Sequence, residues 1–141
     1  MKCSMMGLAL LLFLGAGQTL TGKNEVPLDQ EFTLKIGQQA VVQNTKLKIR
    51  FADVLEDSRC PEGVECIWEG NGKVNLELKK SAKKLISVLV NTGREPRAAE
   101  YRGYTVRLVK LSPSPKAGEV IDPSQYEATL VASKNKPPRQ L

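Results

Sequence analysis

Apolar and polar residues alternate along most of the chain after residue 30, so that every second side chain is apolar. This period of two is the spacing of side chains on one face of a β-strand. Seven strand-like runs are found, over residues 32–36, 40–42, 47–51, 66–78, 85–90, 104–108 and 126–130. Turn-forming residues separate them, and no segment has sustained helical periodicity. The pattern predicts an all-β fold, either an antiparallel β-sandwich of the immunoglobulin-like type or a small barrel of about seven strands.

Four details of this pattern give local predictions. The alternation slips by one residue near Ala52, which predicts a β-bulge there. Even-numbered residues stay on one face through 66–78, which favours one long strand bent at its glycines, although Asn71-Gly72 is also a hairpin signal. The run 85–90 is apolar on both faces, which predicts a central strand. Residues 91–102 are charged and predict a loop.

The first residues have the layout of a secretory signal peptide. Lys2 precedes an apolar run at residues 7–14, and three small residues follow at 15–17. This apolar run is too short to span a membrane comfortably, although an uncleaved N-terminal anchor is the alternative. We therefore divide the chain into a signal peptide (1–17), a flexible lead-in (18–30), a β-sandwich domain (31–133) and a disordered basic tail (134–141).

Two cysteines remain once the leader, with Cys3, is removed. Cys60 and Cys66 are predicted to form a structural disulfide that closes one short loop, because exported proteins fold in oxidising compartments. The segment Cys60-Pro61-Glu62-Gly63 suits a type I turn. A metal-thiolate pair or a redox dithiol is the alternative, but zinc takes four ligands and the chain has no histidine.

The surrounding residues Asp57-Ser58-Arg59-Cys60-Pro61, followed by Cys66, Trp68 and Gly70, carry a resemblance. They resemble a motif of small bacterial exported proteins and lipoproteins of uncharacterised function. The likeness extends weakly to residues 104–108 and 113–115, and so covers about residues 30–133. It implies an exported all-β domain and carries over no catalytic residue. The chain departs from the lipoprotein members because no cysteine follows the hydrophobic leader.

Charge is distributed unevenly. The chain has a formal net charge of +6, yet six acidic residues and only Arg59 lie between Asp53 and Glu69. The acidic cluster could offer oxygen ligands to calcium, but it lacks the spacing of a calcium loop. We expect no metal and no cofactor. Aromatic residues make up 5% of the chain, which is low for stacking on nucleic-acid bases, so no nucleic acid is expected.

The absence of histidine excludes Ser-His-Asp and Cys-His catalytic arrangements. Ser-x-x-Lys patterns occur at 81–84 and 133–136, but both lie in a turn or the tail rather than on a helix. No catalytic residue is therefore predicted, and we expect a protein that is not an enzyme.

Three classes of function remain. The leading hypothesis is an exported, periplasmic or extracellular, monomeric binding domain whose partner is an unknown protein or envelope component. A protease inhibitor is its most specific form, because Arg59 lies beside a disulfide-held loop. The candidate binding residues are Asp57, Arg59, Glu62, Glu65 and Trp68. A carboxylate-dependent envelope enzyme and a structural component of the cell envelope are the alternatives.

Trp68 is expected to be buried beside the disulfide, because it shares its parity with Cys66, Val74, Leu76 and Leu78. A core tryptophan contributes about 3–5 kcal/mol relative to alanine, so replacement by alanine would destabilise such a fold strongly.

Export with cleavage is directly testable. The signal-peptide layout predicts that mass spectrometry of the exported protein finds an N-terminus between Gln18 and Asn24. Recovery of a soluble chain that still begins at Met1 would contradict this prediction.

Overall fold

A computed structural model of the chain describes residues 23–137, and the predicted signal peptide lies outside this range. Nine strands and one short 3-10 helix occur within it. They are β1 (Glu25–Val26), β2 (Glu31–Lys35), β3 (Gln39–Val42), β4 (Leu47–Asp57), β5 (Gly72–Lys80), β6 (Ile86–Asn91), β7 (Ala98–Tyr101), β8 (Tyr104–Ser112), η1 (Pro123–Gln125) and β9 (Glu127–Lys134).

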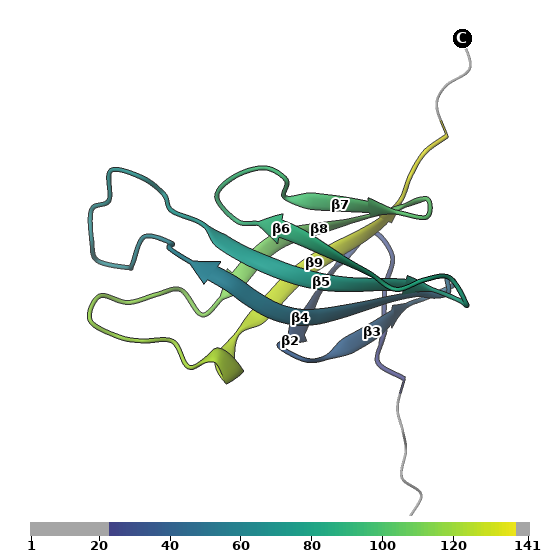
Figure 1. Cartoon of the computed structure of the whole chain (residues 1–141), viewed down its shortest axis with the longest axis horizontal. Coiled ribbons are helices and arrows are strands. Elements are labelled where there is room, and N and C mark those ends of the chain that lie inside the picture. The colour runs from purple at the N-terminus through teal and green to yellow at the C-terminus, as the bar shows by residue number, and fades with distance from the viewer. Residues whose placement is uncertain (1–22, 138–141) are drawn as a thin grey trace, which may run out of the picture.

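The strands form two sheets that pack face to face (Figure 1). One sheet has five strands in the order β1-β3-β4-β5-β6, and the other has four in the order β2-β9-β8-β7. All pairings are antiparallel except that of β1 with β3. The predicted all-β sandwich is therefore confirmed.

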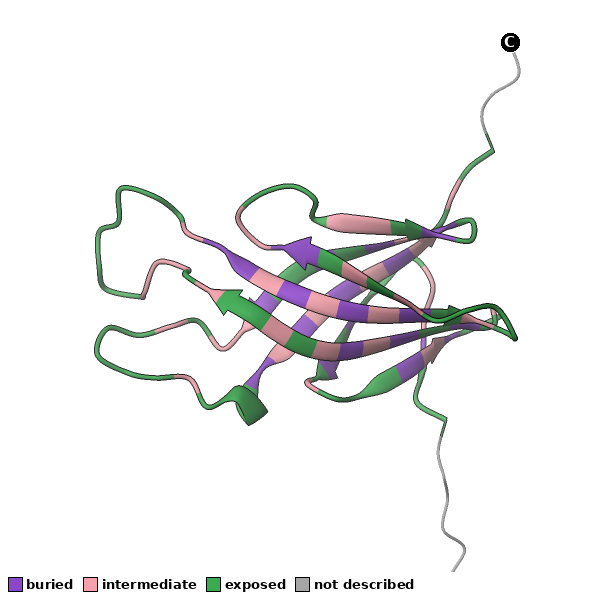
Figure 2. Cartoon of the chain, in the orientation of Figure 1, coloured by how far each residue is buried: buried purple, intermediate pink, exposed green. Residues whose placement is uncertain are grey.

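The core lies between the sheets because alternate side chains of each strand point inward. Figure 2 shows this as buried bands that alternate with intermediate ones along β5, and with exposed or intermediate ones along the first half of β4. On β5, Val74, Leu76 and Leu78 are fully buried, and Phe51 of β4 is the largest fully buried side chain. Apolar burial of this kind is the dominant favourable contribution to folding. The period-two pattern therefore identified the inward faces correctly.

The predicted bulge near Ala52 is also confirmed. The pairing of β4 with β5 shifts register between Phe51 and Asp53. A second shift, between Val54 and Glu56, was not predicted. Bulges bend and twist a strand, and here they lie in the part of β4 that leads out of the core to the disulfide loop.

Two predictions about strand position were wrong. The run 85–90 was expected to be central, but β6 lies at the edge of its sheet with β5 on one side only. Apolar residues on both faces of a strand indicate the environment of its side chains, not the number of its backbone neighbours. Residues 91–102 were expected to be a loop, but they contain β7, which pairs with β8 and contributes the buried side chain of Tyr101.

The prediction for residues 66–78 was wrong in its first half. β5 begins at Gly72, and residues 66–71 belong to the loop that joins β4 to β5. The hairpin alternative at Asn71-Gly72 was wrong as well, because both residues lie at the point where this loop enters β5.

Both ends of the predicted domain extend further than expected. Val26 of β1 is buried and pairs in parallel with Val42, although it lies in the expected flexible lead-in. At the other end β9 includes Lys134, and the Asn135 N–H donates to the Gly103 carbonyl at 2.8 Å.

Candidate functional site

The loop of residues 58–71 projects from one end of the sandwich, between β4 and β5 (Figure 1). Asp57 and Gly72 form the last pair of the two strands before it. Within the loop, Cys60 and Cys66 form the predicted disulfide, with their Cα atoms 5.9 Å apart. The seven-residue ring limits the conformations of the loop tip in both the folded and the unfolded chain.

Backbone hydrogen bonds hold the two sides of the loop together below the ring. The Ser58 N–H donates to the Asn71 carbonyl at 2.7 Å, and the Cys60 N–H donates to the Glu69 carbonyl at 3.0 Å. Gly70 makes this close approach possible, because a Cβ atom there would lie 1.8 Å from the Ser58 carbonyl oxygen, and its φ is +73°. Glycine is the residue that tolerates both conditions.

An ion pair ties the base of the loop to the opposite sheet. The Arg59 guanidinium donates to both carboxylate oxygens of Asp57, with two N–O distances of 2.7 Å. It also donates to the carbonyl oxygens of Leu111 at 2.6 Å and Pro113 at 2.9 Å. The Tyr126 hydroxyl donates to Asp57 Oδ2 at 2.8 Å. Charge-assisted, bidentate hydrogen bonds of this kind are among the strongest in proteins.

These contacts change the acidity of two groups. Burial alone would raise the pKa of Asp57, but the hydrogen bonds from Arg59 and Tyr126 and the charge of Arg59 outweigh it and hold the pKa below its usual value. Burial and the hydrogen bond to the Asp57 carboxylate raise the pKa of Tyr126 to about 12. Both groups therefore remain in one protonation state over the physiological pH range.

A buried pair of amides fixes the second side of the loop. Asn71 Nδ2 donates to Asn91 Oδ1 at 2.9 Å, and Asn91 Nδ2 donates to the Pro96 carbonyl at 3.1 Å. The Gly93 N–H donates to Asn71 Oδ1 at 3.0 Å. Buried polar groups are costly unless they are paired, and no buried side-chain nitrogen or oxygen of residues 23–137 lacks a partner.

The outward side of the loop is apolar. Val64, Ile67 and Trp68 have exposed fractions of 44%, 93% and 82%. The prediction that Trp68 is buried was therefore wrong. The parity argument assumed an extended strand through residue 68, whereas the backbone becomes regular only at Gly72.

A neighbouring loop, at residues 113–122, adds to the same end of the molecule. The Glu62 N–H donates to the Pro115 carbonyl at 2.8 Å, and Glu62 forms an isolated parallel bridge with Lys116. Val120 of this second loop is 97% exposed.

The five predicted binding residues divide into two groups. Asp57 and Arg59 have side chains only 12% exposed and hold each other inside the protein. Glu62, Glu65 and Trp68 are exposed on the loop. Sequence reasoning missed the partners of the ion pair, because Tyr126 and Leu111 lie more than fifty residues away in the chain.

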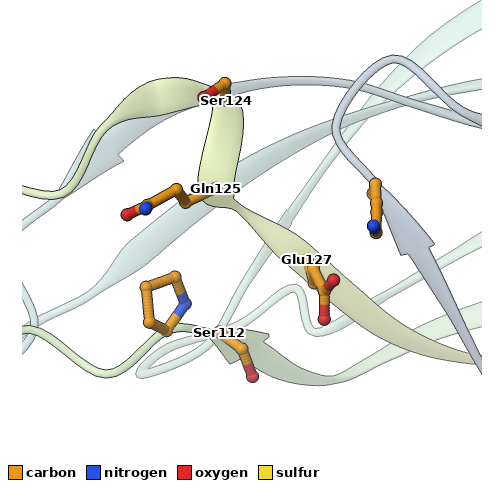
Figure 3. Close-up of a pocket in the computed structure, with 6 residues that line it drawn as sticks. Ser112, Ser124, Gln125 and Glu127 are labelled. Atoms are coloured by element: carbon orange, nitrogen blue, oxygen red, sulfur yellow. The ribbon is translucent and has the colours of Figure 1, made fainter.

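Three open hollows flank this end. One, of about 510 Å³, lies between the loop and residues 93–94, and it is lined by Glu56, Ser58, Trp68, Glu69, Gly70, Asn71, Gly93 and Arg94. The Glu56 carboxylate lies 3.3 Å from Lys73 Nζ and 3.7 Å from Arg94 Nη2. A second, of about 490 Å³, is lined by Lys35, Ser112, Pro113, Ser124, Gln125 and Glu127 (Figure 3). A third, of about 400 Å³, is lined by Arg59, Cys60, Glu62, Glu69, Thr92, Arg97, Val109, Lys110, Leu111, Ser114 and Pro115. The first and the third each bring two carboxylates together, Glu56 with Glu69 and Glu62 with Glu69.

Within residues 23–137, no group of three or more cysteine, aspartate or glutamate side chains is placed to hold a metal ion. Over the same residues, no helix has the length and apolar character needed to cross a membrane.

No protein-family model, curated protein or solved structure matches the chain significantly.

The ion pair predicts a specific pH dependence of stability. The pKa of Asp57 is lower in the folded than in the unfolded chain, so its contribution is present above about pH 4 and is lost as pH falls through the folded-state pKa. Asp57→Asn should lower the free energy of unfolding at pH 7 by about 2–4 kcal/mol, because Arg59 loses its charged partner. Denaturant titrations from pH 7 to acid should show this difference shrinking.

Asp53→Asn is the matched control. Asp53 lies on the same strand and is exposed, and its carboxylate accepts a hydrogen bond from the Val54 N–H. It should change stability by less than about 0.5 kcal/mol. Equal effects of the two Asp→Asn changes would contradict the assignment of the network.

The same network predicts a tyrosine that titrates at unusually high pH. Ultraviolet titration should find a tyrosine with a pKa of about 12 that is missing in Tyr126→Phe.

Proposed function

We propose that the protein is an exported, non-enzymatic binding domain that presents the Cys60–Cys66 loop to a protein partner in the periplasm or outside the cell. The observation that carries this proposal is the exposure of Val64, Ile67 and Trp68 on a loop that a disulfide and the hydrogen bonds of Arg59 hold in place. We call these three side chains the apolar tip.

Rigidity and exposure together suit a recognition loop. The disulfide, the backbone ladder and the Arg59 contacts all lie below or beside the apolar tip. A loop that is already ordered loses little conformational entropy when it binds, so more of its contact free energy appears as affinity. Tryptophan is also among the residues most enriched at the energetic centres of protein interfaces.

Charge around the apolar tip favours a partner with basic residues. Glu62, Glu65 and Glu69 are exposed on the same loop, and none of them forms an ion pair within residues 23–137. A partner pocket that accepts an aromatic side chain and carries lysine or arginine at its rim would match this surface.

The protease-inhibitor form of the hypothesis needs one change. Arg59 cannot enter a protease specificity pocket without giving up its hydrogen bonds to Asp57, Leu111 and Pro113. An inhibitory contact would therefore be made by the apolar tip, and Arg59 and Asp57 would support the loop from behind. Export is supported by the signal-peptide layout and by the disulfide, which suits an oxidising compartment.

Trp68 provides the central test. Trp68→Ala should change the free energy of unfolding by less than about 0.5 kcal/mol, because the side chain is exposed. A photo-crosslinking residue at position 67 should form one discrete adduct in the envelope fraction. Excess wild-type protein should compete for this adduct, whereas Trp68→Ala should compete about 30-fold less well, which corresponds to a hot-spot loss of about 2 kcal/mol.

The matched control is the same photo-crosslinking residue at Lys83, which is exposed in the turn after β5, at the opposite end of that strand from the loop. It should give no such adduct. Adducts of equal yield from both positions, or equal competition by wild type and Trp68→Ala, would contradict the proposal.

A second candidate, a carboxylate-dependent envelope enzyme, is favoured by one observation: Glu56 and Glu69 line the same hollow beside Trp68. Paired carboxylates hydrolyse glycosidic bonds. This candidate predicts that the protein releases new reducing ends from cell-wall glycan and that Glu56→Gln with Glu69→Gln abolishes the release. The binding-domain proposal expects that neither the wild type nor the double variant releases reducing ends.

A further inference from the structure

Strand β6 is an edge strand of the five-stranded sheet, with β5 as its one neighbour (Figure 1). The segment Leu85–Val90 contains no charged residue, proline or glycine. The other edge strands are protected in the usual ways. β1 has only two residues, β2 carries Glu31 and Lys35, and β7 carries Glu100. Charges and short length discourage edge-to-edge pairing, so β6 is the edge that lacks such protection.

The backbone of β6 presents free hydrogen-bonding groups along this edge. The Thr92 N–H donates to the Gly72 carbonyl on the β5 side, whereas the Asn91 N–H points away from β5 and donates to the Pro96 carbonyl. Because N–H groups two residues apart on a strand point to the same side, those of Leu89 and Ser87 also point away from β5. Within residues 23–137, Asn91 is the one residue of this edge whose outward N–H has a backbone hydrogen bond.

The exposed side chains of β6 and of Leu85, which directly precedes it, are arranged symmetrically. Leu85 and Leu89 are 46% and 44% exposed, and Ser87 lies midway between them. An antiparallel copy of the same strand, paired at Ser87, would place each Leu85 opposite Leu89 of the second copy. On the inner face the same register would place Ile86 opposite Val88. Every cross-strand pair from Leu85 to Leu89 would then be uncharged, with Lys84 opposite Val90 just beyond them, and apolar pairs stabilise antiparallel strands.

We propose that β6 is a self-association surface, on which a second copy of this chain pairs antiparallel about Ser87. The two five-stranded sheets would then form one continuous sheet across a two-fold axis. A strand of another protein could also bond to the free N–H groups. The matching of Leu85 with Leu89 about a central serine, however, is complementarity of this chain with itself, as a two-fold interface requires.

The pairing has a consequence for the loop of residues 58–71. β4 and β6 both end beside this loop, since Asp57 pairs with Gly72 and Asn91 pairs with Lys73. Antiparallel copies would therefore carry their two loops at opposite ends of the dimer. The dimer itself does not depend on the proposed function, and its test uses no partner.

Sedimentation of the purified protein over about 1 μM to about 1 mM is the direct measurement, with a monomer–dimer equilibrium expected in this range. The double change Leu85→Lys with Leu89→Lys would place lysines opposite each other twice. It should weaken the dimer on the order of tenfold or more. Leu85→Lys with Leu89→Glu would place opposite charges together. It should restore the dimer at low salt and lose it again at high salt.

Thr33→Lys is the matched control, because it adds a lysine to the exposed edge strand β2, and it should dimerise like the wild type. Circular dichroism establishes that each variant is folded, and Ser87→Lys, which places two lysines at the centre of the pairing, is a second disrupting variant. A wild type that stays monomeric throughout, or a dimer that the β6 lysines leave intact, overturns the proposal. If the lysine–glutamate variant dimerises no more tightly at low salt than the lysine–lysine variant, the proposed register is wrong.

Discussion

The loop end of this sandwich depends on the ion pair of Asp57 with Arg59. Asp57 ends a strand of one sheet, and through Arg59 it reaches two carbonyl oxygens at the end of β8 in the other. The pair therefore adds to side-chain packing, since it joins the two sheets at the end of the apolar core, beside the buried side chains of Leu111 and Tyr126. Both charges are largely removed from water, so loss of either partner leaves the other uncompensated.

The same ion pair determines which residues of the loop are available for contacts. Arg59 and Asp57 satisfy each other, and Asn71 and Asn91 satisfy the opposite side of the base. Hydrogen bonds between polar groups thus hold the inner part of the loop in place, and the disulfide restrains its tip. The apolar tip is left outside, without the burial that usually follows from the hydrophobic effect. A stable arrangement of this kind is typical of surfaces that are completed by a partner.

The sequence predicted the strands in which several successive side chains alternate between the core and the surface. The alternation in residues 47–51 and 104–108 was sufficient, because burial of one face fixes the period and the register together. It missed the short strands β1 and β7, each of which has one side chain that is less than a tenth exposed, Val26 and Tyr101. It also failed where no face of a regular strand is buried or where the question is which strands are neighbours. Trp68 was assigned to the interior by counting through a loop whose backbone turns at Gly70, and β6 was placed centrally because side-chain pattern carries no information about backbone neighbours.

For the candidate site, the sequence predicted the disulfide but not which residues around it are buried and which are exposed. Cysteine number and leader were enough to predict the disulfide. Arg59 is largely buried and Trp68 is exposed, the reverse of what the sequence indicated, and this difference has a physical cause. Arg59 is charged and beside the ring, which suggests exposure, but its carbonyl partners come from a segment more than fifty residues away. Only the packing of the two sheets brings them together.

The apolar tip and the β6 edge differ in how they would recognise a partner. The apolar tip offers side chains on a rigid backbone, so its recognition depends on residue identity, and one substitution at Trp68 is enough to change it. The β6 edge offers backbone N–H and carbonyl groups, which any extended strand can match, and its selectivity must come from the side chains that flank them. In this chain those flanking side chains are uncharged and symmetric about Ser87. That arrangement favours the chain's own copy over strands that carry charges, because a charged residue opposite Leu85 or Leu89 would replace the apolar contact that the second leucine makes.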